Sequence, residues 1–226
     1  MNTIHLLSWF QAPLFALIFI LILRSKFSIN SWKYILRAFL FGMASVLFIF
    51  LLDLIAGAWG YDQLKNLKRS AFFSFVIIGF GSEFGKFLIL RYIFLPLKSF
   101  KSPLDGVIYS IFISLGFATI ALPLYTSGFF SREVEPLFIF TFPFANLLFS
   151  IIMGFFVGMG KMRKNRLIDS VTGLGSASFF HGFYFFTFLT SDKTILLVYG
   201  LGVFLIAVLL GAKSLNVKSR EESNRE

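Results

Sequence analysis

Long apolar stretches separated by short polar segments make up most of this chain. Seven of them reach the length of about 20 residues that an α-helix needs to cross a bilayer. They are predicted at 4–23, 38–59, 71–94, 106–125, 136–160, 167–189 and 195–211. We therefore predict an all-α fold, a polytopic membrane bundle of about seven transmembrane helices. It forms one domain, residues 1–211, followed by a polar tail, 212–226, that we expect to be disordered.

The composition supports a membrane protein. Hydrophobic residues make up 57% of the chain, phenylalanine alone accounts for 34 residues, and charged residues make up only 14%. A soluble domain carries about 25% charged residues. This composition excludes an ordinary soluble globule, a disordered chain and a disulfide-rich secreted domain. The chain has no cysteine and only two histidines, His5 and His181, which excludes thiolate metal sites and sites built from several imidazoles.

The basic residues predict how the helices are oriented in the membrane. The formal net charge is +10, and an excess of this kind in a membrane protein reflects basic cytoplasmic loops more often than nucleic-acid binding. Seven spans place fourteen Lys and Arg residues on one side. They place five on the other: Lys65, Lys68, Arg69, Arg132 and Lys193. The positive-inside rule then predicts that the N-terminus is outside and that the C-terminal tail is cytoplasmic.

Polar residues within the predicted spans are candidates for a functional site, because charges at membrane depth are costly. Glu83 lies near the middle of the third span, and Lys86 follows on the same helix face. The pair is either a desolvated base held by a lysine or a buried ion pair that fixes helix packing. Glu83 lies about 18 Å and His181 about 12 Å from the outer ends of their spans, so they could meet in one cavity. The set is Asp53, Glu83, Lys86, Arg91, Asn146 and His181.

Other sites are possible around these residues. His181 is a metal ligand, a proton carrier or a hydrogen-bonded packing residue. Ser178, one turn earlier, suggests a Ser/His dyad, but the nucleophile elbow G-x-S-x-G is absent. Asp53 ends the second span and has no facing aspartate in a GxGD motif, which argues against an aspartyl protease. Arg91 is close enough to the cytoplasmic end to extend its guanidinium there, and Asn146 can hydrogen-bond between helices.

Four segments in a fixed order resemble a known family. They are SEFGKF at 82–87, SPLDGVIYSIFISLGFATIALPLY at 102–125, FPFANLLFSIIMGFFVGMGK at 142–161 and HGFYFF at 181–186. In this order they resemble the PrsW family of bacterial intramembrane proteases, a relative of the CAAX-protease and bacteriocin-processing superfamily. The resemblance covers about residues 71–186. It implies a site at Glu83, Lys86 and His181, zinc as cofactor if the protease is active, and cleavage of a single-span substrate such as an anti-sigma factor.

The same comparison shows substitutions at the remaining family positions. The family motif E-E-x-x-K reads S-E-F-G-K here, so Ser82 replaces the first glutamate. Ala121 stands at the glutamate of GFAxxENxxY, Ala145 at a histidine, and Phe185 at the aspartate of H-G-x-x-D. A catalytic zinc needs about three protein ligands, and only Glu83 and His181 remain. Glu133 and Glu135 would have to enter the bilayer region to compensate.

We weigh three functions. The first is a catalytically impaired homologue that binds or regulates a membrane-protein client and needs no cofactor. The second is an active PrsW-type protease with Glu83 as base and His181 as zinc ligand or acid. The third is a small transporter, which the chain supports least because it lacks broken helices and a series of titratable groups. All three imply a multi-pass protein of the bacterial cytoplasmic membrane, in contact with lipid and with no nucleic acid.

Overall fold

The computed structural model describes residues 3–26, 32–129, 135–163, 166–190 and 193–223, and these residues form only helices and short connections. The all-α prediction is confirmed for this part of the chain. The helical elements are α1 (Thr3–Lys26), α2 (Trp32–Ala44), α3 (Val46–Ala58), α4 (Leu67–Phe72), η1 (Phe73–Phe80), α5 (Gly81–Ile89), η2 (Leu90–Phe94), α6 (Pro103–Thr126), α7 (Pro136–Arg163), α8 (Arg166–Thr190) and α9 (Lys193–Ser223).

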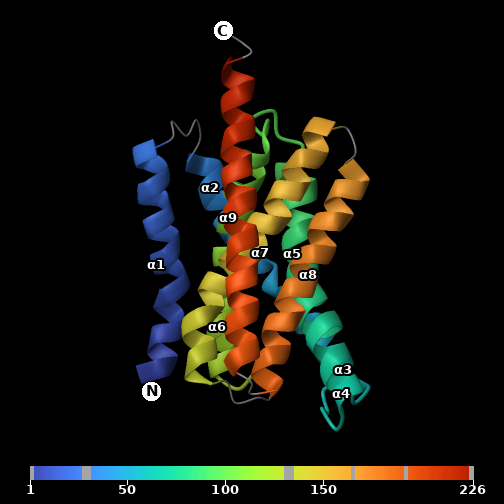
Figure 1. The fold of residues 1–226 in the computed structure, drawn as a ribbon. Helices are drawn as coiled ribbons and strands as arrows, with labels where there is room; N and C mark the ends of the chain where they lie inside the picture. The colour runs from blue at the N-terminus through green and yellow to red at the C-terminus, as the bar shows by residue number, and fades with distance from the viewer. Residues whose placement is uncertain (1–2, 27–31, 130–134, 164–165, 191–192, 224–226) are drawn as a thin grey trace.

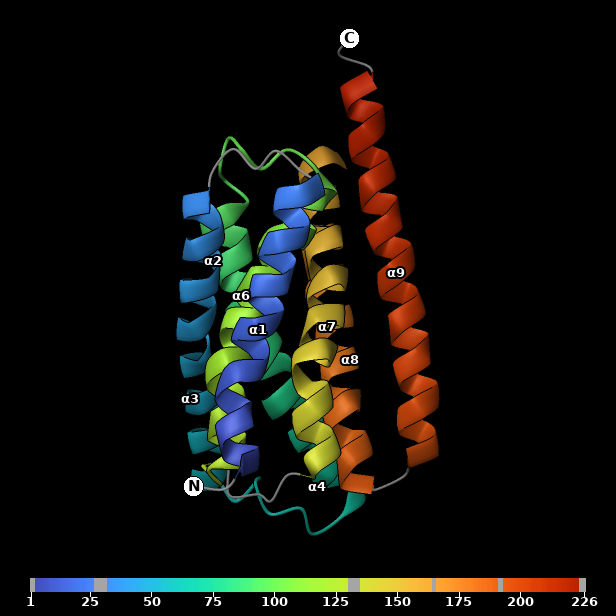
Figure 2. The ribbon, with the colours of Figure 1, turned by 90° about the vertical axis from the view of Figure 1, so that its left-hand side faces the viewer.

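The described elements run up and down as seven passes, in agreement with the predicted bundle of about seven helices. α2 and α3 together make the second pass, with a break at Ser45, and the run from α4 to η2 makes the third. The first residues of α1 and the last residues of α9 lie at opposite ends of the bundle (Figures 1 and 2), as an odd number of passes requires. The side of the membrane on which each end lies stays a prediction.

The passes differ in burial and in hydropathy. α6 lies at the centre, where 83% of its most apolar window is buried, whereas α9 lies against the outside of the bundle with 11% buried. Within the described residues, six helical stretches are long and apolar enough to cross a membrane. α8, although 25 residues long, is not among them. Its membrane position therefore rests on its place in the bundle, between α7 and η1.

The tail after Gly211 does not begin with a disordered segment. α9 continues as a helix through Ser223, and its upper part projects beyond the other helices (Figure 2). The expectation of disorder after Gly211 is therefore wrong for residues 212–223. Local helix formation in this polar stretch continues from the preceding apolar turns, because adding a residue to an existing helix is far easier than starting a new one.

Glycines allow the central helices to approach closely. A methyl group added at Gly116 of α6 would lie 2.0 Å from the Phe39 carbonyl oxygen of α2, and one at Gly106 would lie 2.2 Å from the Gly154 carbonyl oxygen of α7. Small residues at such positions let backbones pack against each other in membranes, where the hydrophobic effect supplies no force between helices. These contacts hold α6 between α2 and α7.

The segment PLDG, part of the family resemblance, marks the start of α6. Pro103 occupies the first turn, where its missing N–H is not needed. The Ser102 and Asp105 side chains form a capping box, in which Asp105 Oδ2 accepts the Ser102 backbone N–H at 2.8 Å. Gly106 is the glycine that faces α7. This motif therefore sets where α6 begins and how closely it packs.

The third pass contains two π-helical segments, which the sequence did not indicate. η1 precedes α5 and η2 follows it, so the α-helical turns that carry Glu83 and Lys86 are bounded on both sides by wider turns. π-Helical turns are rare and occur frequently at functional sites. They change the rotation of α5 relative to the neighbouring turns and thereby decide which of its residues face the core.

Candidate active site

Glu83 and Lys86 of α5 and His181 of α8 lie in direct contact. Glu83 Oε1 accepts hydrogen bonds from Lys86 Nζ at 2.5 Å and from His181 Nδ1 at 2.7 Å. A carboxylate has only acceptor oxygens, so both nitrogen atoms act as donors here. Their similar predicted depths allowed Glu83 and His181 to meet, and the structure brings them into direct contact.

Glycines in both elements bring α8 against the third pass at this level. A methyl group at Gly79 of η1 would lie 2.5 Å from the Ser178 carbonyl oxygen. One at Gly182 would lie 2.7 Å from the Phe75 Cα atom. Because backbone meets backbone at these positions, the side chains of Glu83 and His181, which lie nearby along the two helices, can bridge the interface.

Two further helices complete the cluster around Lys86. Its Nζ atom donates to Ser114 Oγ of α6 at 3.2 Å and to Asn146 Oδ1 of α7 at 3.0 Å. The interhelical role predicted for Asn146 is confirmed. Ser114 was not predicted, because a single hydroxyl in an apolar helix commonly bonds only its own backbone. We call Glu83, Lys86, Ser114, Asn146 and His181 the polar cluster.

The polar cluster is enclosed. The side chains of Glu83 and Lys86 are 0% exposed and that of His181 is 1% exposed. The Phe149 ring stacks on the His181 ring with 5.1 Å between centroids, and Phe142 meets it edge-on at 6.1 Å. Glu83 Oε2 is buried and has no hydrogen-bond partner among the described residues. Chemically, the arrangement is a desolvated carboxylate with one oxygen engaged by two nitrogen atoms.

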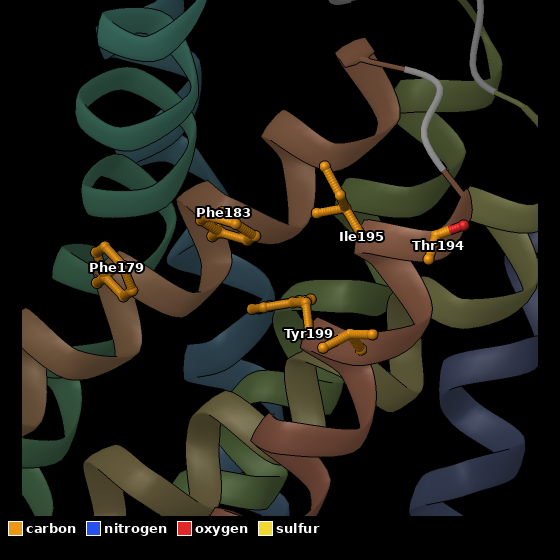
Figure 3. A pocket seen from close by; sticks show the side chains of 6 residues that line it. Phe179, Phe183, Thr194, Ile195 and Tyr199 are labelled. Carbon is orange, nitrogen blue, oxygen red and sulfur yellow. The ribbon is translucent and has the colours of Figure 1, made fainter.

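An apolar groove lies elsewhere, between α8 and the start of α9. Figure 3 shows Phe179 and Phe183 of α8 facing Ile195 and Tyr199 of α9. The lining, which Thr194 and Val198 complete, includes no member of the polar cluster. The groove therefore offers no visible path for a substrate to Glu83.

The substituted family positions lie next to polar-cluster residues in the sequence or one to two helical turns from them. Ser82 is fully buried, and its Oγ atom has no hydrogen-bond partner in the part of the chain described. Ala121 and Ala145 are buried too. The Phe185 ring lies 6.2 Å from the rings of Phe73 and Phe138 and 6.3 Å from that of Tyr125.

The aromatic contacts around Phe185 form a second group. Phe138 is central in it, with ring centroids 5.3 Å from Tyr125 and 5.1 Å from Phe142. We call Phe73, Tyr125, Phe138, Phe142 and Phe185 the aromatic layer. Each lies farther than the polar-cluster residue of its own pass toward the end at which α6 finishes and α7 begins.

The other candidates take structural positions. Arg91 Nη1 donates to the Arg166 carbonyl oxygen at 2.8 Å and to the Ser170 hydroxyl, so it binds the first turn of α8. Ser178 Oγ has no hydrogen-bond partner among the residues that the structure describes, so no Ser178–His181 dyad is formed. Asp53 lies on α3, outside the polar cluster. Glu135 is exposed, and Glu133 lies outside the described residues.

Comparison with known proteins decides the family. The family model of PrsW intramembrane metalloproteases matches residues 30–212, well beyond the part in which the motifs were found. The chain belongs to the PrsW family. Proteins named Protease PrsW are similar to it, one from Geobacillus kaustophilus at 29% identity over 87% of this chain and 84% of the relative. Another, from Oceanobacillus iheyensis, is 31% identical over 77% and 79%. No solved structure matches the chain.

The metal that the PrsW family description implies does not fit the polar cluster. Zinc takes histidine nitrogen, carboxylate oxygen or thiolate ligands, with three from the protein at a catalytic site. Only Glu83 and His181 are of these types here. Across the described residues there is no group of three or more His, Cys, Asp or Glu side chains that could hold a metal. The Glu83 Oε1 atom is already engaged by Lys86 Nζ and His181 Nδ1.

Proposed function

We propose that this PrsW-family chain is a catalytically impaired homologue that binds a single-span membrane protein and regulates it without cutting it. The observation that carries the proposal is the set of hydrogen bonds that the buried Glu83 carboxylate makes. Its Oε1 atom accepts from both Lys86 and His181 inside an enclosed cluster. A general base must reach a water molecule beside the substrate, and this carboxylate faces a lysine and a histidine instead.

The substituted positions support the same proposal. Where the family carries acids or an imidazole, this chain has Ser82, Ala121, Ala145 and Phe185, and all four are buried. A carboxylate at Phe185 would lie among aromatic rings, and a buried charge is costly unless it is paired. The chain keeps the packing elements, such as the capped start of α6, and lacks the groups that activate water. We place the protein in the bacterial cytoplasmic membrane, in keeping with its bacterial relatives.

The test begins with capture of the client in native membranes. The chain is given a photo-crosslinking residue on the exposed face of α3 or α9, and bound single-span proteins are identified. Each is then co-expressed with the wild type and with Glu83→Gln. We expect full-length client with both forms and equal amounts of complex. A shorter client that appears with the wild type and is absent with Glu83→Gln would overturn the proposal.

A restoration experiment provides the positive control for zinc. The variant Ser82→Glu/Ala121→Glu/Ala145→His/Phe185→Asp returns the four family positions to their usual residues. We expect the purified wild type to contain zinc only at background level and the restored variant to gain zinc. Zinc bound to the wild type in a 1:1 ratio would contradict the proposal.

A second candidate, an active PrsW-type protease, is favoured by one observation. Glu83 Oε2 is buried without a hydrogen-bond partner in the described part of the chain, and a carboxylate oxygen of this kind can accept a proton from water. The cleavage assay above separates the two candidates. An active protease requires that cleavage depend on Glu83 and His181.

A further inference from the structure

The geometry points to an ammonium-binding site inside this bundle, in which the tethered cation is the Lys86 side chain and the ligands come from three helices. A lysine ammonium has three N–H donors and no acceptor. The three oxygen atoms around Lys86 Nζ are Glu83 Oε1, Ser114 Oγ and Asn146 Oδ1, at 2.5, 3.2 and 3.0 Å. We propose that these atoms form a site selective for a primary ammonium group.

The ligands are held in position by hydrogen bonds of their own. Ser114 Oγ donates to the Asn146 carbonyl oxygen at 2.9 Å, which leaves its lone pairs for Lys86. Asn146 Nδ2 donates to the Phe142 carbonyl oxygen at 3.0 Å, so the amide oxygen is the atom that faces Lys86. His181 donates to the same carboxylate oxygen that binds the ammonium. Each ligand group therefore makes a hydrogen bond besides the one to Lys86, which fixes its orientation.

An aromatic ring completes the site. Lys86 Nζ lies 4.7 Å from the centroid of the Phe117 ring. The face of such a ring attracts a cation, and the attraction is larger when water is excluded. Three oxygen ligands and one ring face suit an ammonium ion. Zinc does not take a phenyl ring as a ligand, and it needs ligand distances of about 2.0–2.2 Å. The site thus binds a cation of a different class from the one the family description implies.

This inference rests on the proposed function, because a zinc-loaded protease would not have Lys86 bound to these three oxygen atoms. It names the cation that the impaired site holds. It predicts that stability does not depend on divalent metal. The melting temperature of the wild type in detergent should be unchanged by a chelator or by added zinc. It also predicts that a free primary amine can replace the side chain once the tether is removed.

The decisive experiment uses Lys86→Ala in the full chain. This substitution removes three carbon atoms and the nitrogen, which together correspond to n-propylammonium. We expect the variant to melt about 10 °C below the wild type and n-propylammonium to restore at least half of that loss. Neutral n-propanol, of similar size, and tetramethylammonium, which has no N–H donor, should restore none of it.

Further variants test the assignment of the ligands. In the Lys86→Ala background, Asn146→Leu should raise the n-propylammonium concentration needed to restore the melting temperature at least tenfold, because one ligand oxygen is lost. Thr172→Val, at an exposed hydroxyl that bonds only its own helix, is the matched control and should leave it unchanged. Two results would overturn the inference: equal rescue by n-propanol, or Lys86→Ala as stable as the wild type.

If Lys86→Ala does not fold without a ligand, folding itself becomes the measurement. The variant is then produced with n-propylammonium or n-propanol in the medium and during purification, and the monodisperse fraction is compared. Recovery with the amine alone supports the site, and no recovery with either compound contradicts it. Zinc bound and used for cleavage by the wild type would instead contradict the proposed function, so the two failures are distinguishable.

Discussion

The polar cluster and the aromatic layer occupy neighbouring turns of the same helices and are stabilised in opposite ways. In the polar cluster, Lys86 Nζ uses its donors on oxygen atoms from α5, α6 and α7, and small changes in position would break hydrogen bonds. In the aromatic layer, Phe138 contacts rings from α6, α7 and α8 without any directional bond from its own side chain. Phe185, a ring where the family pattern has an aspartate, belongs to the apolar level, while a buried charged pair remains at the level beside it.

Removing the charge of Lys86 should have the largest effect. Lys86→Met keeps the length of the side chain but leaves the Glu83 carboxylate buried with one donor fewer. We expect a loss of about 3–5 kcal/mol in the free energy of unfolding, the usual cost of breaking a buried ion pair on one side. Reversible unfolding in mixed micelles measures it. Lys98→Met, at an exposed lysine, is the control, and equal effects of the two substitutions would show that the cluster contributes little.

Truncating the centre of the aromatic layer should cost slightly less. Phe138→Ala removes a fully enclosed ring, and we expect a loss of about 3 kcal/mol because the cavity left behind can collapse only in part. The matched substitution is Phe140→Ala, two residues along α7 at a ring that is 57% exposed. The same unfolding assay should find less than about 1 kcal/mol there. If the two values agree, lipid and protein would be equivalent surroundings for these rings.

An intermediate effect is expected at the link between the helices. Asn146→Leu removes one oxygen ligand of Lys86 and leaves an apolar side chain of similar size, so the loss should be about 1–3 kcal/mol. Ser150→Ala, on the same helix, removes only the bond from Ser150 Oγ to the Leu147 carbonyl oxygen. We expect the unfolding free energy to change less for Ser150→Ala, and the reverse order would contradict the assignment of Asn146 to the cluster.

The smallest effect should arise at the hydroxyl group of Tyr184, beside the aromatic layer. Tyr184 Oη lies 2.7 Å from Thr141 Oγ1 and 3.2 Å from the Phe138 carbonyl oxygen. Tyr184→Phe should cost about 1 kcal/mol, because the ring and its packing stay in place. Tyr92→Phe, at a ring that is 68% exposed, should change nothing measurable. A large loss for Tyr184→Phe would mean that this layer too depends on a directional bond.

Much of the fold follows from local patterns in the sequence. The apolar stretches predict the passes because hydropathy decides which segments enter a bilayer, and six of the passes meet that criterion in the described residues. The three-residue spacing of Glu83 and Lys86 predicts their contact, and the similar depths of Glu83 and His181 predict their meeting. The first contact depends on helix geometry alone, whereas the second also needs α8 to pack against the third pass, and the structure has both.

Other features depend on packing between distant helices and were not predicted. The π-helical segments η1 and η2 were not predicted from their residue types. Ser114 is one of several small polar residues in apolar helices, and only the position of Lys86 makes it a ligand. The break at Ser45 follows Gly42, whose carbonyl oxygen accepts from the Ser45 hydroxyl at 2.6 Å, and this Gly and Ser combination was a local signal that sequence reasoning missed.

The modest hydropathy of α8 has a consequence for biogenesis. When the ribosome delivers each segment to the insertion machinery, α8 is the pass that is less able than the other six to partition into lipid alone. Only residues 164–165 separate the end of α7 from its start. We therefore expect α8 to insert together with α7 as a helical hairpin, in which the His181 ring stacks on Phe149 of α7. The histidine of the site would then reach the membrane interior only with the help of the preceding helix.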